Sequence, residues 1–239
     1  MNLVVDIGNS TSKIALFDGT RMVMRKRLSA NFAEEMSALA QTAPIDAVAY
    51  SSVSEPQRHI VECLRRIAPK VLEVKGNVPT PLLCDYRTPE TLGSDRLAAA
   101  VGAATLCPDT ELLVIDAGTC ITYDFVGADR HYKGGNISPG LGMRLRALHD
   151  QTARLPLVDA EGETPGTGKD TQTAIRCGVV RGMAYEIDGY IRHFMQQYPQ
   201  GRVFLTGGNA YRFAQETDVE RNDTLVEIGL NTILEYALD

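Results

Sequence analysis

Hydrophobic residues near the start of the chain form short runs separated by polar turns. Apolar runs at residues 3–5 and 14–17 predict two strands, and the second is followed by Asp18-Gly19, a strong hairpin signal. Alternating positions predict a third strand over residues 21–28. We then expect helices over residues 31–42 and 56–67 and strands over residues 45–53 and 71–74. This order predicts a mixed sheet with helices on its faces, the arrangement of a ribonuclease H-like lobe.

The second half of the chain starts in a similar way. Apolar runs predict strands over residues 112–116, 121–126, 132–137 and 202–206 and helices over residues 141–153, 171–197 and 226–238. A Gly-Gly-Asn turn at residues 207–209 follows the last of these strands. The long helix carries Gly178, Gly182 and Gly189, which indicates close packing against another helix, either of this chain or of a partner subunit.

One stretch occurs twice. The sequence VVDIG at residues 4–8 returns as VIDAG at residues 114–118, and each copy leads through polar residues into another apolar run. Asp6 and Asp116 are therefore expected at strand ends beside turns of small residues, an arrangement that suits a phosphate and its cation. A single such aspartate more often caps its own turn, and two strands can end alike by chance. The long interval favours two similar lobes, residues 1–110 and 111–239, around a central cleft.

A Pro-rich connector over residues 77–90 leads into Gly93-Ser94-Asp95-Arg96. Ser94 is expected as the N-cap of a buried Ala-rich helix that ends near residue 106. The helix dipole favours an acid in the first turn, so a structural role for Asp95 competes evenly with a chemical one. Capping explains Arg96 less well.

Composition narrows the classes of function. The 239 residues carry a formal charge of −6, which argues against nucleic acid as the partner. The one basic run, at residues 21–27, is interpreted as a solvated strand edge. No signal-peptide pattern and no apolar run of membrane-spanning length is present in the sequence. We therefore expect no membrane partner. The five cysteines are scattered and form no Cys-x-x-Cys pair, so we expect a reduced, cytoplasmic protein.

The sequence of residues 162–170 is similar to a phosphate-binding Walker A loop. The glycine spacing is one residue too long, and Asp170 stands where a Ser or Thr must bind magnesium. We interpret this stretch as a surface loop. The sequence also lacks the motifs of serine hydrolases and of zinc proteases.

Two lobes with paired Asp-x-Gly turns resemble the superfamily of acetate and sugar kinases, heat-shock ATPases and actin, which predicts an α/β, actin-like ATPase fold. The motifs DIGNS at residues 6–10, GSDR at 93–96, DAGT at 116–119, GNISPG at 135–140 and TGG at 206–208 occur in the order found in type III pantothenate kinases. This resemblance covers nearly the whole chain, and GSDR is its most specific element. Ser10 replaces the family's commoner threonine, and Cys120 an expected alanine.

The resemblance implies ATP-dependent phosphorylation of pantothenate to 4'-phosphopantothenate, the first step of coenzyme A biosynthesis, with Asp95 as the general base. It implies Mg²⁺ with ATP, a monovalent cation (K⁺ or NH₄⁺) at Asp116, and a homodimer. Asp6 is expected near the divalent cation, and the role of Lys13 is in doubt. The implied ATP contacts are Asp6, Ile7, Gly8, Asn9, Ser10, Thr11, Ser12, Lys13 and Thr119, and the implied substrate contacts are Tyr86, Gly93, Ser94, Asp95, Arg96 and Thr171.

Two competing hypotheses remain at this point. The first is a catalytically inactive nucleotide-binding regulator on the same fold, against which the intact set of Asp6, Asp95, Arg96 and Asp116 argues. The second is a kinase for another small hydroxyl compound, which the sequence excludes less well.

Overall fold

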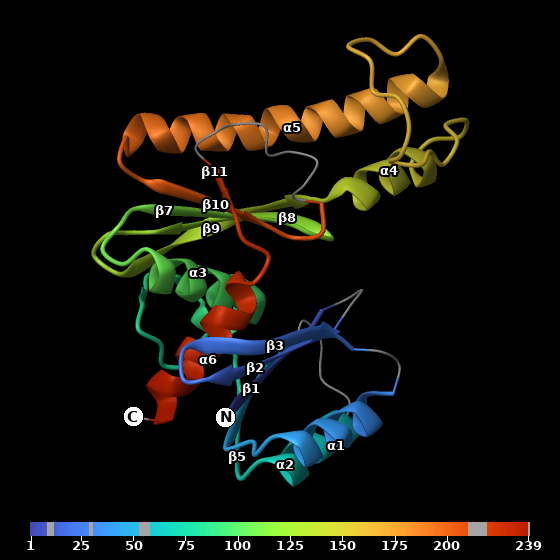
Figure 1. The fold of residues 1–239 in the computed structure, drawn as a ribbon. Helices are drawn as coiled ribbons and strands as arrows, with labels where there is room; N and C mark the ends of the chain where they lie inside the picture. The colour runs from blue at the N-terminus through green and yellow to red at the C-terminus, as the bar shows by residue number, and fades with distance from the viewer. Residues whose placement is uncertain (9–11, 29–30, 53–57, 210–218, 239) are drawn as a thin grey trace. The chain divides into compact units, whose positions relative to one another are not determined.

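The fold is described from a computed structural model for residues 1–8, 12–28, 31–52, 58–209 and 219–238 (Figure 1). The chain divides into two compact units. The first contains Met1–Thr110, Phe125–Gly134 and Thr224–Asp239, and the second contains Glu111–Asp124 and Gly135–Asp223. The C-terminal segment thus groups with the first unit, and a lobe boundary between residues 110 and 111 stays a prediction.

The first unit is built on a five-stranded mixed sheet. Its strands are β1 (Asn2–Ile7), β2 (Ser12–Asp18), β3 (Arg21–Arg27), β4 (Ala47–Ser52) and β5 (Lys70–Glu73), in the order β3-β2-β1-β4-β5. The pairs β1–β2 and β2–β3 are antiparallel, and β1–β4 and β4–β5 are parallel. This topology follows from the strand and helix order that the hydrophobic pattern predicts.

The two faces of this sheet are buried by different helices. Leu3, Val5 and Ile14 join a core cluster with residues of α1 (Phe32–Thr42) and α2 (Arg58–Ile67). Because side chains alternate along a strand, Val4 and Ala15 point to the other face. There α6 (Leu225–Leu238) packs against β1 and β4.

A close helix crossing completes this side of the first unit. The Ala-rich helix α3 (Ser94–Leu106) packs along α6, and most of its residues are buried. A methyl group added at Gly102 would lie 2.1 Å from the carbonyl oxygen of Leu225, and one added at Gly229 would lie 1.8 Å from that of Ala98. The two glycines therefore let the helix backbones touch.

The second sheet repeats the order of the first. Its strands are β6 (Leu83–Cys84), β7 (Leu112–Ala117), β8 (Cys120–Val126), β9 (His131–Pro139), β10 (Arg202–Thr206) and β11 (Val219–Arg221), in the order β11-β10-β7-β8-β9-β6. Both β7 and β11 lie parallel to β10. The order β9-β8-β7-β10-β11 corresponds strand by strand to β3-β2-β1-β4-β5, with β7 in the place of β1.

The helices of the second unit are α4 (Leu141–Asp150) and α5 (Thr171–Gln197), which pack on one another. The expected bounds of α5 are confirmed. Its buried residues include Ile175, Val179, Met183, Ile187 and Ile191, a four-residue spacing that places one apolar stripe on the core.

The N-terminal caps of α5 and α3 can be compared with the residues that the sequence analysis considered. Asp170 is the N-cap of α5 and forms a capping box with Thr173, which accounts for an acid at the end of the Walker-like stretch. The expected cap of α3 is wrong, because Gly93 is the N-cap and Ser94 is already helical. The carbonyl of Gly93 closes that first turn by accepting from the N–H of Leu97.

Two short elements were not expected. The segment predicted as an irregular connector, residues 77–90, contains the strand β6 and the start of the 3₁₀ turn η1 (Pro89–Thr91). Both residues of β6 are exposed, so no alternation of buried positions marks it in the sequence.

Across the described helices, no segment has the length and apolar character needed to span a bilayer.

Candidate active site

Asp6 occupies the carboxyl end of β1, the central strand of the first sheet. In the parallel pairing of β1 with β4 it lies opposite Ser51, whose hydroxyl donates a 3.0 Å hydrogen bond to Oδ1 of Asp6. Open sheets with parallel strands bind ligands at this end. The register therefore fixes a carboxylate at the place where a ligand is expected.

The electrostatic surroundings of Asp6 favour a cation. Burial is the largest effect and raises the pKa of Asp6 to about 6, and the negative charges of Glu227 and Asp95 act in the same direction. The hydrogen bond from Ser51 and the charge of Lys13 lower the pKa but do not compensate. A metal ion beside a carboxyl group in such an environment would stabilise its ionised form, because the positive charge offsets the cost of burial and the nearby negative charges.

The residues after Asp6 are described in part. Lys13 on β2 lies opposite Asp6 in the antiparallel register, so its position beside the carboxylate is set by the hairpin. Ile7, Gly8 and Ser12 are partly buried. The predicted phosphate contacts Asn9, Ser10 and Thr11 lie outside the described residues.

Asp95 and Arg96 begin α3 in the same unit as Asp6. Oδ1 of Asp95 accepts a 2.8 Å hydrogen bond from the backbone N–H of Arg96. A methyl group added at Gly93 would lie 2.6 Å from that oxygen, so glycine leaves room for the carboxylate. The negative charge of Asp95 is the weakest of the effects that act on the pKa of Asp6, so these two carboxylates, separated widely in the sequence, lie in one region of the first unit.

Arg96 lies against the predicted substrate residue Tyr86. The guanidinium carbon is 5.9 Å from the centre of the Tyr86 ring, and Arg96 is only 6% exposed. The Tyr86 ring in turn lies 6.2 Å from the ring of Tyr132. An arginine that is held by an aromatic ring and is little exposed is suited to bind a carboxylate with both arms of its fork. Tyr86, Gly93, Ser94, Asp95 and Arg96 thus all belong to the first unit.

Glu227 is a residue that the sequence interpretation missed. It lies on α6 with 0% exposure, and Nε of Arg25 on β3 donates a 2.8 Å hydrogen bond to its Oε1. Its Oε2 has no hydrogen-bond partner in the described part of the chain. The interpretation of the basic strand as a solvated edge is therefore wrong for Arg25. A charged residue on the apolar face of a helix was the available signal.

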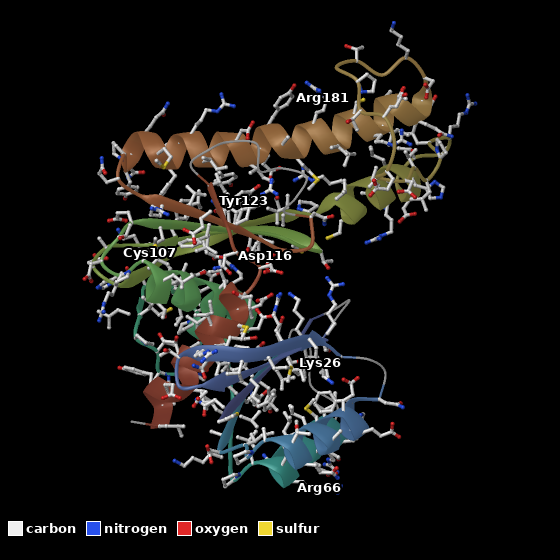
Figure 2. All side chains as sticks on the ribbon, in the orientation of Figure 1. Lys26, Arg66, Cys107, Asp116, Tyr123 and Arg181 are labelled. Carbon is white, nitrogen blue, oxygen red and sulfur yellow. The ribbon has the colours of Figure 1, made fainter. Side chains whose placement is uncertain are left out.

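Asp116, which Figure 2 labels, is the last residue but one of β7 in the second unit. Asp6 has the same position in β1 of the first unit. The partner of Asp116 in the parallel register is Thr206 on β10, again a hydroxyl residue. Gly207 has a φ of +93°, and a methyl group there would lie 2.3 Å from Oδ1 of Asp116. A side chain at position 207 would therefore collide with the carboxylate, and glycine avoids this.

Two further predicted residues belong to the second unit. Thr119 is exposed in the turn between β7 and β8, and its carbonyl accepts a 3.1 Å hydrogen bond from the N–H of Gly140. Thr171 is the exposed first residue of α5. In the described part of the chain, no three acidic, His or Cys side chains form a ready metal site. Magnesium usually binds one or two carboxylates together with substrate phosphates, so the single aspartate Asp6 fits such chemistry.

Comparisons with known proteins agree with this picture. A family model described as type III pantothenate kinase matches residues 2–193. A type III pantothenate kinase from Bacteroides fragilis is 46% identical over 238 residues, which cover 99% of this chain and 98% of that protein.

Solved structures share the fold at low identity. A conserved protein from Campylobacter jejuni, described as a Baf family transcriptional activator, has a TM-score of 0.64 at 18% identity and covers 99% of this chain and 98% of its own. An activator of 2-hydroxyisocaproyl-CoA dehydratase from Clostridium difficile, solved with bound ADPNP, has a TM-score of 0.53 at 13% identity and covers 100% and 94%. The expected α/β class, shared with sugar kinases, is confirmed. By the matched model and by identity over its full length, the chain belongs to the type III pantothenate kinase family.

Proposed function

We propose that this protein transfers the terminal phosphate of ATP to the primary hydroxyl of pantothenate and so forms 4'-phosphopantothenate, the first step of coenzyme A biosynthesis. Membership of the family supports this, because a relative named as a type III pantothenate kinase is 46% identical over 238 residues. The structural observation that carries the proposal is the presence of two carboxylates in one unit, Asp6 near the carboxyl end of β1 and Asp95 in the first turn of α3. One carboxylate suits the cation that accompanies ATP, and the other suits a base.

Asp95 is the group that we assign as general base. It begins α3 beside the guanidinium-bearing residue Arg96, so a hydroxyl compound whose carboxylate binds Arg96 would present its hydroxyl near Asp95. A primary alcohol is a weak acid, and Asp95 accepts its proton late, as charge develops on the attacking oxygen. Gly93 and Ser94 shape the same turn, and Tyr86 holds Arg96. Thr171 is assigned as a further substrate contact.

ATP is assigned to the turn that follows β1 and to Thr119. Asp6 holds the divalent cation that accompanies the phosphates, and Lys13 beside it stabilises negative charge. We assign the phosphates to the segment from Asp6 to Lys13, of which residues 9–11 lie outside the described part of the chain. Phosphoryl transfer needs mainly such positioning and charge stabilisation, since most of the charge is spread over phosphate oxygens.

Asp116 is assigned to an activating monovalent cation, K⁺ or NH₄⁺. The glycine at position 207 supports this, because a side chain there would meet Oδ1 of Asp116, and its absence leaves space for an ion beside the carboxylate oxygen. Hard cations prefer such oxygen ligands.

A homodimer through α5 is also part of the proposal. A methyl group added at Gly178, Gly182 or Gly189 would meet nothing within 4 Å among the described residues. The close packing expected at these glycines is therefore left to a second copy of the chain. We place the protein in the cytoplasm, as expected for five free cysteines.

One coupled assay of ADP formation tests the proposed reaction. The purified protein is supplied with MgATP, with and without KCl, and with pantothenate, other vitamins or sugars as acceptors. Turnover with pantothenate that rises with KCl is expected. Turnover with another acceptor alone would instead support a different kinase, and ATP binding without any turnover would support an inactive regulator.

A further inference from the structure

The middle of α5 is tied to the sheet of the second unit by one carboxylate, Glu186. Its Oε1 accepts hydrogen bonds from the hydroxyls of Tyr123 at 2.8 Å and Ser138 at 2.5 Å. Its Oε2 accepts from Nη2 of Arg144 at 2.5 Å. The three donors come from β8, β9 and α4, so a single side chain joins four elements. The roles proposed above use none of these four residues.

Glu186 is held in its charged form. Burial acts to raise the pKa of Glu186, but the hydrogen bonds from Ser138, Arg144 and Tyr123 outweigh it and lower the pKa below its usual value. A carboxylate at neutral pH therefore accepts all three bonds. Hydrogen bonds to a charged group are roughly twice as strong as neutral ones, which makes this connection stiff.

The partners of Glu186 hold the turn between β9 and α4. Nε of Arg144 donates to the carbonyl of Pro139 at 2.7 Å, and its Nη2 lies 3.2 Å from the hydroxyl of Ser138. The ion pair of Glu186 and Arg144 is thus hydrogen-bonded to both Ser138 and Pro139. Gly140, the N-cap of α4, follows directly.

That turn packs on the loop that carries Thr119. The N–H of Gly140 donates to the carbonyl of Thr119 at 3.1 Å. A methyl group added at Gly140 would lie 2.2 Å from that oxygen and 2.6 Å from the carbonyl oxygen of Gly118. No space separates the two segments, so a shift of residues 138–140 must move the Thr119 loop as well.

From these contacts we infer that Glu186 is a positioning residue for nucleotide binding, which acts through the Ser138–Gly140 turn on Thr119. This inference rests on the proposed ATP contact of Thr119. Glu186 does not carry the packing of α5, because Met183 and Ile187 are fully buried on that helix. In addition, Tyr190 stacks on Tyr123 with ring centres 3.7 Å apart. Replacement of Glu186 should therefore loosen the loop without unfolding the unit.

The test compares Glu186→Ala and Glu186→Gln with the wild type. Both steady-state kinetics and calorimetric titration with MgADPNP are measured. We expect Glu186→Ala to raise the KM for ATP and the Kd for MgADPNP about tenfold, with the KM for pantothenate changed less than about twofold. Glu186→Gln keeps an oxygen acceptor for Tyr123 and Ser138, so it should restore part of the affinity.

A matched control and a folding check complete the design. Glu220→Gln removes another carboxylate of the second unit, one that accepts from Arg202 at 3.0 Å on the exposed surface, and it should leave all constants unchanged. Thermal unfolding identifies variants that are folded. A folded Glu186→Ala with wild-type affinity for MgADPNP, or one in which both KM values change alike, would overturn the inference. The titration needs no turnover, so it decides the inference even if pantothenate is not the substrate.

Discussion

Ser51 lies opposite Asp6 on the neighbouring parallel strand and donates a 3.0 Å hydrogen bond to its Oδ1. The second unit repeats the pairing, with Thr206 on β10 opposite Asp116 on β7. In each sheet, the residue that faces the aspartate across the central parallel pair carries a hydroxyl. The repeat in the sequence is therefore a repeat of a local arrangement, with an acid on one strand and a hydroxyl on the next.

Ser51→Ala should weaken the use of magnesium. Loss of the hydrogen bond raises the pKa of Asp6 further, because that bond favours the ionised form. We expect the Mg²⁺ concentration for half-maximal rate to rise about three- to tenfold at pH 7, since a hydrogen bond to a charged group contributes about 1.5 kcal/mol. Initial rates at varied free Mg²⁺ measure this half-maximal concentration for the wild type and the variant.

Ser52→Ala is the control for this change. The hydroxyl of Ser52 is buried and has no partner in the described part of the chain. Its removal should leave the Mg²⁺ dependence unchanged. An equal effect of both variants would contradict a specific role for Ser51.

Asp6→Asn should stabilise the protein while it abolishes activity. The pKa of Asp6 is raised from 3.8 to about 6, so the folded state binds a proton more tightly than the unfolded state. The free energy of unfolding therefore falls as the pH rises from about 4 to 6, and the penalty is complete above pH 6. At pH 7.5 without Mg²⁺ we expect Asp6→Asn to gain about 1–3 kcal/mol in urea unfolding.

The gain from Asp6→Asn should shrink as the pH is lowered to 4, where wild-type Asp6 is mostly protonated in the folded state. Unfolding curves at both pH values separate this effect from a change in packing. A gain that is the same at pH 4 and 7.5 would exclude the charge as its cause.

Asp95→Asn should abolish phosphate transfer and keep nucleotide binding. Loss of a general base lowers kcat about 10²–10⁴-fold, whereas the affinity for MgADPNP should change little. Asp109→Asn removes a carboxylate of the same unit that lies 3.6 Å from Arg130, and it should keep full activity. Retained activity of Asp95→Asn would remove Asp95 from the mechanism.

Gly207→Ala should disturb the proposed monovalent cation site. Its methyl group would lie 2.3 Å from Oδ1 of Asp116, and a φ of +93° is strained for alanine. We expect the KCl concentration for half-activation to rise about tenfold or activation to be lost. Gly208→Ala meets nothing within 4 Å among the described residues and should keep the KCl dependence.

Arg25→Leu should destabilise the first unit. It removes the 2.8 Å hydrogen bond to Glu227, a carboxylate with 0% exposure. Breaking one side of a buried ion pair costs about 3–5 kcal/mol, and the double variant Arg25→Leu with Glu227→Leu should recover most of that loss. Urea unfolding of the wild type, Arg25→Leu, Glu227→Leu and the double variant forms the required double-mutant cycle. A double variant no more stable than Arg25→Leu would contradict the claim that the unpaired Glu227 carboxylate causes the loss of stability.

Much of the fold was predictable because it depends on local patterns. The alternation of strands β1 and β2, the stripe of α5 and the repeated Asp-x-Gly turn all lie within short stretches of sequence. The strand β6 was not predictable, since its two exposed residues have no pattern of burial. The N-cap of α3 was misplaced because Gly93 closes the turn with its carbonyl, which no side chain reveals.

The sequence by itself determined the class of the fold, the two aspartate turns and the family, because these depend on residue types at fixed spacing. Only the tertiary structure decided which distant residues meet. Sheet register brought Ser51 to Asp6, the crossing of α3 and α6 placed the helix that carries Glu227, and the α5 packing brought Glu186 to Ser138 and Arg144. Such contacts join residues far apart in the chain, and their geometry arises only when the hydrophobic faces pack together.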